Sequence, residues 1–310
     1  MASKRNPDIR GVVPAIYTPF NEDLSIDDSG LSALADRMAS VDGVGAVFCT
    51  GHAGEVASLS RAERKKVVSI VTEAVDGRVP VLAGIYSDSL DESIEHAKDA
   101  KAAGASVVTV FPPNVFAGGG TSDSRRPFLW HDRIAKDAEI AICLFQFPAA
   151  SGLGYSTETL VELASLPEIV AVKEGSGSPL AYECNVTALA QVDPPVPVLT
   201  SNNEWWLADL AFGGDGILSG SGPVMIEEQV SLWRAMKNCD LASARRIQDR
   251  IRPLIRTFYK HPDLEMHNRM KNALVMMGQL KCAAVRPPLL PLDQAELSDI
   301  RSNLEKVGLL

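Results

Sequence analysis

The chain has 310 residues, of which 46% are hydrophobic and 22% charged, and its formal net charge of −9 gives a pI of about 5.1. This composition is typical of a water-soluble globular protein, and the negative charge argues against non-specific binding to nucleic acid. No apolar run approaches the roughly 18 residues that a membrane helix needs, and the polar start MASKRNPDIRG does not resemble a secretory signal, so we expect a cytoplasmic protein.

Short apolar runs alternate with longer amphipathic stretches over about 230 residues. The apolar runs, each predicted to be a strand, are residues 12–17, 45–50, 79–85, 106–111, 140–145, 169–173, 196–200 and 216–219. The amphipathic stretches, each predicted to be a helix, are residues 27–39, 61–75, 90–103, 125–137, 157–165, 180–190, 204–212 and 223–237. Several of these helices begin with a polar capping residue, such as Ser60 with Glu63 three residues later.

Eight strand–helix pairs in succession predict an α/β fold, a (β/α)8 TIM barrel over residues 1–238. The competing fold is a doubly wound sheet, which normally carries GxGxxG after its first strand, where this chain reads TPFNEDLS. After residue 239 the alternation stops. The stretches 242–259, 263–280 and 294–307 read as helices, with the proline-rich VRPPLLPLD before the last one, and predict a C-terminal helical domain over residues 239–310.

One lysine, Lys173, ends the apolar run of the sixth strand in LPEIVAVKEGSGS. In a barrel of this kind reactive groups sit at the carboxyl ends of strands. A buried lysine has a lowered pKa, and its neutral amine is a nucleophile. The alternative interpretation is a structural cation paired with a carboxylate.

The second candidate is the segment CTGHAGEVASLS after strand two. Gly51 and Gly54 allow a tight turn whose N–H groups can bind a carboxylate. His52 lies inside this turn, where it is either a surface histidine or a group for proton transfer near neutral pH. Glu55 is interpreted as structural, at the start of the following helix.

Three further loops follow strand ends. LFQFPAASG offers Gln146 as a hydrogen-bonding group, and FPPNVFAGGG offers Asn114 beside a glycine run that is a candidate lid. SNNEWW carries amides and the pair Trp205–Trp206, which we interpret as packing residues. Five scattered cysteines show no CxxC or Cys/His ligand spacing, so we expect neither a disulfide framework nor a metal site.

In order along nearly the whole chain, GVVPAIYTPF, TGHAGEVASLS, VPVLAGI, IVAVKEGSG, GGDGILSG and VRPPLLPL resemble the dihydrodipicolinate synthase / N-acetylneuraminate lyase family. The resemblance implies a (β/α)8 barrel with a C-terminal helical domain, assembled as a homotetramer. It also implies a Schiff base between Lys173 and a 2-oxo acid such as pyruvate, with no cofactor. We predict that the substrate-binding residues are Gly51, Ala53, Phe145, Gln146, Asn114 and Ser219.

The chain departs from the family pattern at three positions. Phe145 stands where the family has its catalytic tyrosine, Ala150 where the synthases place an arginine, and Asn114 where the family has a second tyrosine. We therefore expect a lyase with dehydratase or aldolase chemistry, in which His52 replaces the tyrosine as general acid/base. The alternatives are dihydrodipicolinate synthase proper, a family member that binds 2-oxo acids but has lost turnover, and a metal-dependent aldolase on the same barrel.

Overall fold

The apolar runs of the sequence form parallel strands in the computed structural model, which describes residues 5–310. Nearly every strand residue is buried, as expected for parallel strands covered on both faces. The strands are β1 (Gly11–Pro14), β2 (Val47–Cys49), β3 (Val81–Ile85), β4 (Val107–Val110), β5 (Ala141–Gln146), β6 (Ile169–Glu174), β7 (Val198–Thr200) and β8 (Gly216–Ser219).

These strands form one sheet in the order β1-β8-β7-β6-β5-β4-β3-β2. Parallel bridges from Val12 to Val44 and from Ala15 to Phe48 join the two ends of the sheet, so the strands close into a barrel. The predicted (β/α)8 fold is therefore confirmed, and the doubly wound alternative is excluded.

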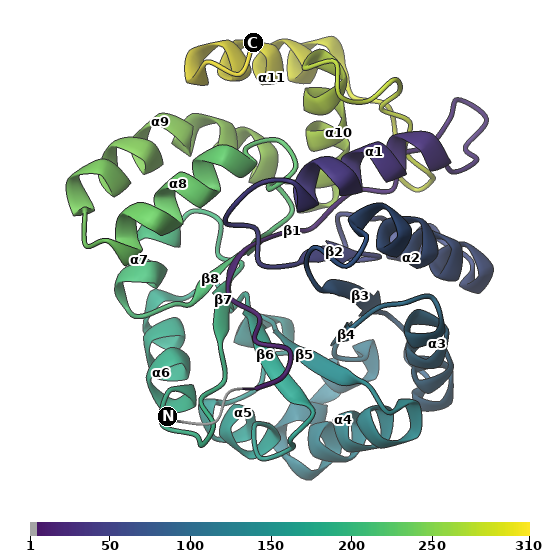
Figure 1. Ribbon diagram of the computed structural model, residues 1–310, viewed down its shortest axis with the longest axis vertical. Coiled ribbons are helices and arrows are strands. Elements are labelled where there is room, and N and C mark those ends of the chain that lie inside the picture. The colour runs from purple at the N-terminus through teal and green to yellow at the C-terminus, as the bar shows by residue number, and fades with distance from the viewer. Residues whose placement is uncertain (1–4) are drawn as a thin grey trace.

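A helix follows each strand, and Figure 1 shows these helices succeeding one another around the barrel. They are α1 (Asp28–Ala39), α2 (Arg61–Val75), α3 (Leu90–Ala102), α4 (Arg125–Ala138), α5 (Thr157–Leu163), α6 (Pro179–Leu189), α7 (Trp206–Ala211) and α8 (Ile226–Lys237). The predicted cap at Ser60 is a full capping box with Glu63, which explains why α2 begins where the sequence predicts.

Three more helices follow α8: α9 (Leu241–Tyr259), α10 (Met266–Met276) and α11 (Gln294–Val307). They lie outside α8 and α1 in Figure 1, in green to yellow. The predicted helix 263–280 is shorter than expected, because a 3-10 turn (Asp263–Glu265) precedes α10 and the helix ends at Met276. That residues 239–310 form a domain of their own stays a prediction.

The register of the central strands positions the residues of interest. Phe145 of β5 pairs with Lys173 of β6, which pairs in turn with Leu199 of β7. All three lie near the carboxyl ends of their strands, where the loops after β2, β4, β5 and β8 also begin. Within residues 5–310, no helix has the length and apolar character needed to span a bilayer.

Candidate active site

Lys173 is the fifth residue of β6, and only 7% of its surface is exposed. Its Nζ atom lies 3.4 Å from the ring centroid of Phe145 and 5.7 Å from that of Phe48. Within residues 5–310, Nζ has no hydrogen bond and no ion pair. Burial lowers the pKa of this amine to about 7. The carboxylate partner required by the structural-cation interpretation is thus absent from the described residues.

Aromatic rings from the ends of β4 and β5 create the apolar surroundings of this amine. The ring centroid of His52 lies 4.7 Å from that of Phe111, 5.9 Å from that of Phe145 and 6.0 Å from that of Phe147. Burial, followed by the charges of Lys173 and His267, lowers the pKa of His52 to about 3. These surroundings disfavour the imidazolium, and that His52 transfers protons near neutral pH stays a prediction.

The turn after β2 is tight and leaves backbone N–H groups free. Thr50 adopts a left-handed conformation with φ 49°, and a Cβ atom on Gly51 would lie 2.7 Å from the Phe48 ring. Within residues 5–310, the backbone N–H groups of Gly51, His52 and Ala53 donate no hydrogen bond. Three successive free N–H groups are the arrangement expected of an anion-binding turn, and that a carboxylate binds here stays a prediction.

A buried ion pair fixes this turn to the C-terminal helices. Glu55, also left-handed with φ 53°, ion-pairs with Lys271 of α10, and its second oxygen accepts the Arg286 backbone N–H at 3.1 Å. The side chains of Glu55 and Lys271 are 3% and 0% exposed. Glu55 thus has a structural role, although it precedes a 3-10 turn (Val56–Ser58) rather than a helix.

On the outer side of β6, Glu174 anchors the neighbouring loops. Its carboxylate accepts hydrogen bonds from Asn185 Nδ2 at 3.1 Å and Asn202 Nδ2 at 2.9 Å, and burial raises its pKa. Asn202 also donates to Asp209, whose pKa burial raises to about 6. This network holds the loops after β6 and β7, and therefore the end of the strand that carries Lys173.

Hydroxyl groups gather at the end of β8, and sequence reasoning found only one of them. Ser219 Oγ lies 3.2 Å from Tyr259 Oη and donates to Asn203 Oδ1 at 2.7 Å. Tyr17 Oη donates to Gly220 O at 2.5 Å. A Cβ atom on Gly220 would lie 3.4 Å from that of Ala53, so this cluster borders the turn after β2. Tyr259 comes from α9, and no local pattern in the sequence marks it.

Two of the predicted binding residues are engaged elsewhere. The side-chain amide of Gln146 donates to Tyr155 O at 2.8 Å and accepts from Tyr155 N at 2.9 Å, so it shapes the loop after β5. The exposed Asn114 lies within 3.4 Å of Tyr86 Oη and Asp88 Oδ2. That either residue contacts substrate stays a prediction.

The tryptophan pair after β7 divides between core and surface. Trp206 is fully buried, as expected for a packing residue, whereas Trp205 is 47% exposed.

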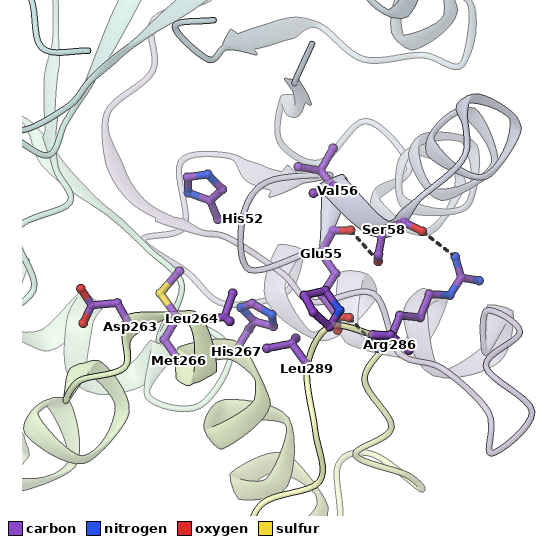
Figure 2. A pocket seen from close by; sticks show the side chains of 13 residues that line it. His52, Glu55, Val56, Ser58, Asp263, Leu264, Met266, His267, Arg286 and Leu289 are labelled. Carbon is purple, nitrogen blue, oxygen red and sulfur yellow. Dashed lines mark hydrogen bonds between the residues drawn. The ribbon is translucent and has the colours of Figure 1, made fainter. Parts of the chain in front are cut away.

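A cavity of about 480 Å³ lies between the turn after β2 and the C-terminal segment (Figure 2). His52 lines it from the barrel, and Met266 and His267 line it from α10. His267 is 7% exposed, and neither of its ring nitrogens has a hydrogen-bond partner among the described residues. The sequence does not mark His267 as a site residue. It lies 94 residues after Lys173, within a helical pattern that carries no site motif.

The fold and this site define the class of the protein as a (β/α)8 barrel with a candidate active site at the carboxyl ends of its strands. The model of the dihydrodipicolinate synthetase family matches residues 8–307, and the chain belongs to that family. The 4-hydroxy-tetrahydrodipicolinate synthase of Methanothrix thermoacetophila is 31% identical over 300 residues, 96% of this chain and 97% of that protein. The synthase of Hyphomonas neptunium is 32% identical over 302 residues, 96% of this chain and 98% of that protein.

Solved structures agree with this assignment. A monomeric dihydrodipicolinate synthase variant has a TM-score of 0.90 at 26% identity, with 97% of this chain and 98% of that chain covered. A prophage protein of the dihydrodipicolinic acid synthase family from E. coli K12, solved in complex with pyruvate, has a TM-score of 0.88 at 27% identity, covering 97% of this chain and 99% of that one. The predicted family is confirmed, and with it an enzyme of the lyase class.

Proposed function

We propose that this enzyme is a lyase that forms a Schiff base between Lys173 and the C2 carbonyl of a 2-oxo acid. The observation that carries the proposal is the buried amine without an ion-pair partner, whose pKa of about 7 leaves much of it neutral at physiological pH. The free N–H groups of Gly51, His52 and Ala53 are the proposed site for the substrate carboxylate.

The chemistry follows from the electron-withdrawing power of the iminium. The amine adds to C2, and the carbonyl oxygen leaves as water after accepting two protons. In aldol cleavage the C4 hydroxyl loses its proton, the C3–C4 bond breaks, and its electron pair moves into the iminium. In dehydration C3 loses a proton and the C4 hydroxyl leaves as water. The enamine left by aldol cleavage takes up a proton at C3 and becomes an iminium again, and hydrolysis of the iminium in either route returns the free lysine.

His52 is the proposed proton carrier in place of the family's tyrosine, because Phe145 has no hydroxyl. In the free enzyme its imidazole is neutral. A substrate carboxylate at the adjacent turn introduces a negative charge, which stabilises the imidazolium and raises the pKa of His52. Substrate binding would thus move His52 towards the range in which a histidine can exchange protons.

Dihydrodipicolinate synthase proper is the alternative, since the curated relatives bear a name of that activity. Three residues argue against this alternative. Phe145 and Asn114 stand where the expected pattern has tyrosines, and Ala150 stands where it has an arginine. Ala150 is an exposed residue in a 3-10 turn (Ala149–Ser151) and has no group that could bind a second carboxylate. A family member that binds 2-oxo acids without turnover is the other alternative.

Reductive trapping tests the proposal directly. Borohydride added with pyruvate should attach one reduced pyruvate to Lys173, detected by peptide mass spectrometry. Lys271 is a matched internal control, because it is equally buried but ion-paired with Glu55. An unmodified Lys173, or equal modification of both lysines, would contradict the proposal. Release of pyruvate or loss of water from 4-hydroxy-2-oxo acids of increasing length then distinguishes a lyase from a non-catalytic binder.

We also propose that the enzyme works in the cytoplasm as a homotetramer that arises as a dimer of dimers. The tetramer rests on the family resemblance, and one structural neighbour is a monomeric variant. Sedimentation equilibrium distinguishes one, two and four chains of 33.2 kDa.

A further inference from the structure

The cavity beside His52 is mostly apolar. Its walls include Val56 from the turn after β2, Leu264 and Met266 from the start of the α10 segment, and Pro287, Pro288 and Leu289 from the connector before α11. A volume of about 480 Å³ falls within the range of small-molecule sites. The cavity is therefore large enough to hold a ring-sized group.

The charged groups around the cavity are already paired or lie at its edge. The Glu55 carboxylate is ion-paired with Lys271, and the Arg286 guanidinium with Glu63 at 2.6 Å. Asp263 is exposed. These residues offer no unpaired cation to a second carboxylate on a ligand. The apolar walls offer few hydrogen-bond partners to a chain of hydroxyl groups.

His267 is the exception in this apolar lining. It is more than nine-tenths buried, yet both ring nitrogens lack a hydrogen-bond partner within the described chain. Leaving a buried polar group without a partner costs about 1–3 kcal/mol. In Figure 2 its side chain lies among the lining residues below His52. A ligand with one hydroxyl or carbonyl group would supply a partner for one of these two nitrogens.

The cavity borders the surroundings of Lys173 through one shared residue, His52. His52 lines the cavity, and its ring packs against Phe145, whose ring lies against Lys173 Nζ. His52 therefore stands between the Lys173 amine and the cavity, and a substrate bound at Lys173 that reached beyond His52 would enter the cavity.

We propose that this cavity binds the distal part of the substrate, and that the substrate is a 2-oxo acid whose chain beyond C3 carries an apolar, ring-sized group with one polar atom bonded to His267. This inference rests on the proposed Schiff-base function and narrows it. It favours aryl or alicyclic tails over the polyhydroxylated tails of sugar acids.

The test compares five 2-oxo acids by borohydride trapping at Lys173: pyruvate, 2-oxoglutarate, a 2-oxo-3-deoxy sugar acid, 2-oxo-4-phenylbutanoate and its 4-hydroxyphenyl analogue. The measured quantity is the concentration that gives half-maximal adduct. We expect this concentration to be at least tenfold lower for the two aryl acids than for the sugar acid and 2-oxoglutarate. We also expect the hydroxyphenyl compound to bind more tightly than the phenyl compound.

Two variants assign the preference to the cavity. Leu289→Ser should reduce the ratio of aryl-acid to pyruvate affinity about tenfold, while its matched control Leu290→Ser, at a 70% exposed neighbour, should not change it. His267→Phe should abolish the preference for the hydroxyphenyl over the phenyl acid, and His267→Gln should restore part of it. A thermal melt of each variant confirms folding.

Equal or better trapping of the sugar acid, or an aryl preference that both His267→Phe and Leu289→Ser leave intact, overturns the inference while leaving the Schiff-base function standing. No adduct with any of the five acids overturns both.

Discussion

The reactivity of Lys173 depends on whether its amine is neutral. With a pKa of about 7, the rate of adduct formation with pyruvate should rise with pH and level off above neutrality. At pH 6 it should be about one tenth of its plateau, because one pKa unit corresponds to a tenfold change in the minor form. Cyanoborohydride trapping between pH 5.5 and 9 measures this. A rate that still climbs tenfold per unit at pH 9 would indicate an ordinary lysine.

The same burial has a cost in stability. The folded-state pKa of Lys173 lies below its ordinary value of 10.5, so the unfolded chain binds more protons between about pH 7 and 10.5. Stability therefore rises with pH through this window, and the full penalty applies below it. Lys173→Met should abolish trapping and stabilise the fold at pH 7 by about 2–5 kcal/mol. Urea titrations at pH 7 and pH 10 check this, since the difference between the two proteins should shrink at the higher pH.

His52 should affect turnover rather than imine formation. His52→Ala should lower kcat on the true substrate more than tenfold, while trapping of pyruvate at Lys173 continues. Because its pKa in the free enzyme is about 3, the pH profile of kcat/KM should show no limb from His52 between pH 5 and 9. Turnover within tenfold of the wild type would remove His52 from the mechanism.

The bounds of a helix or strand could be predicted where the sequence carries a local capping or turn motif. Helix α2 begins at its predicted residue because Ser60 and Glu63 form a capping box, and it ends at its predicted residue, Val75, where Asp76 is left-handed. Strand β8 has its predicted bounds because apolar residues fill a short run between glycine-rich turns. The arrival of Tyr259 and His267 at the mouth of the barrel was not predictable. Their contacts with the loops after β8 and β2 join residues far apart in sequence, and helix periodicity carries no information about such contacts.

The loop after β2 and helix α10 depend on one buried ion pair. Removing one charge of such a pair leaves the other buried without compensation, which typically costs 3–5 kcal/mol. Glu55→Gln should therefore destabilise the protein by about 3–5 kcal/mol, because Lys271 is fully buried. The double variant Glu55→Leu with Lys271→Met should lose less than the sum of the single variants.

Chemical denaturation measures these differences. Asp137→Asn serves as the control, since it breaks the surface pair with Arg133, in which both side chains are exposed. It should change stability little. A Glu55→Gln protein as stable as this control would show that the buried pair does not hold the two elements together.

At the scale of the whole molecule, the sequence predicted a barrel and a helical appendage, but the structure makes the appendage part of the site. Helix α9 packs on α8 with buried apolar residues such as Leu254 and Phe258, and supplies Tyr259 to the end of β8. Helix α10 supplies Lys271 to the turn after β2, and His267 to the cavity. The amphipathic pattern of these helices predicts that one face of each helix is buried. It does not predict which surface of the barrel covers that face, because that surface forms only when distant parts of the chain fold together.

The barrel should consequently fail to fold without its C-terminal helices. A chain ending at residue 238 would lose the Glu55–Lys271 ion pair and would expose the apolar face of α8, so lost burial opposes folding. We expect the full chain to unfold in a single calorimetric transition, and the 1–238 fragment to lack near-UV circular dichroism and a cooperative melt. Adding a 239–310 peptide should restore part of both signals. A 1–238 fragment that melts cooperatively would instead establish the barrel as an independent domain, and the helices would then close a site on a scaffold that folds without them.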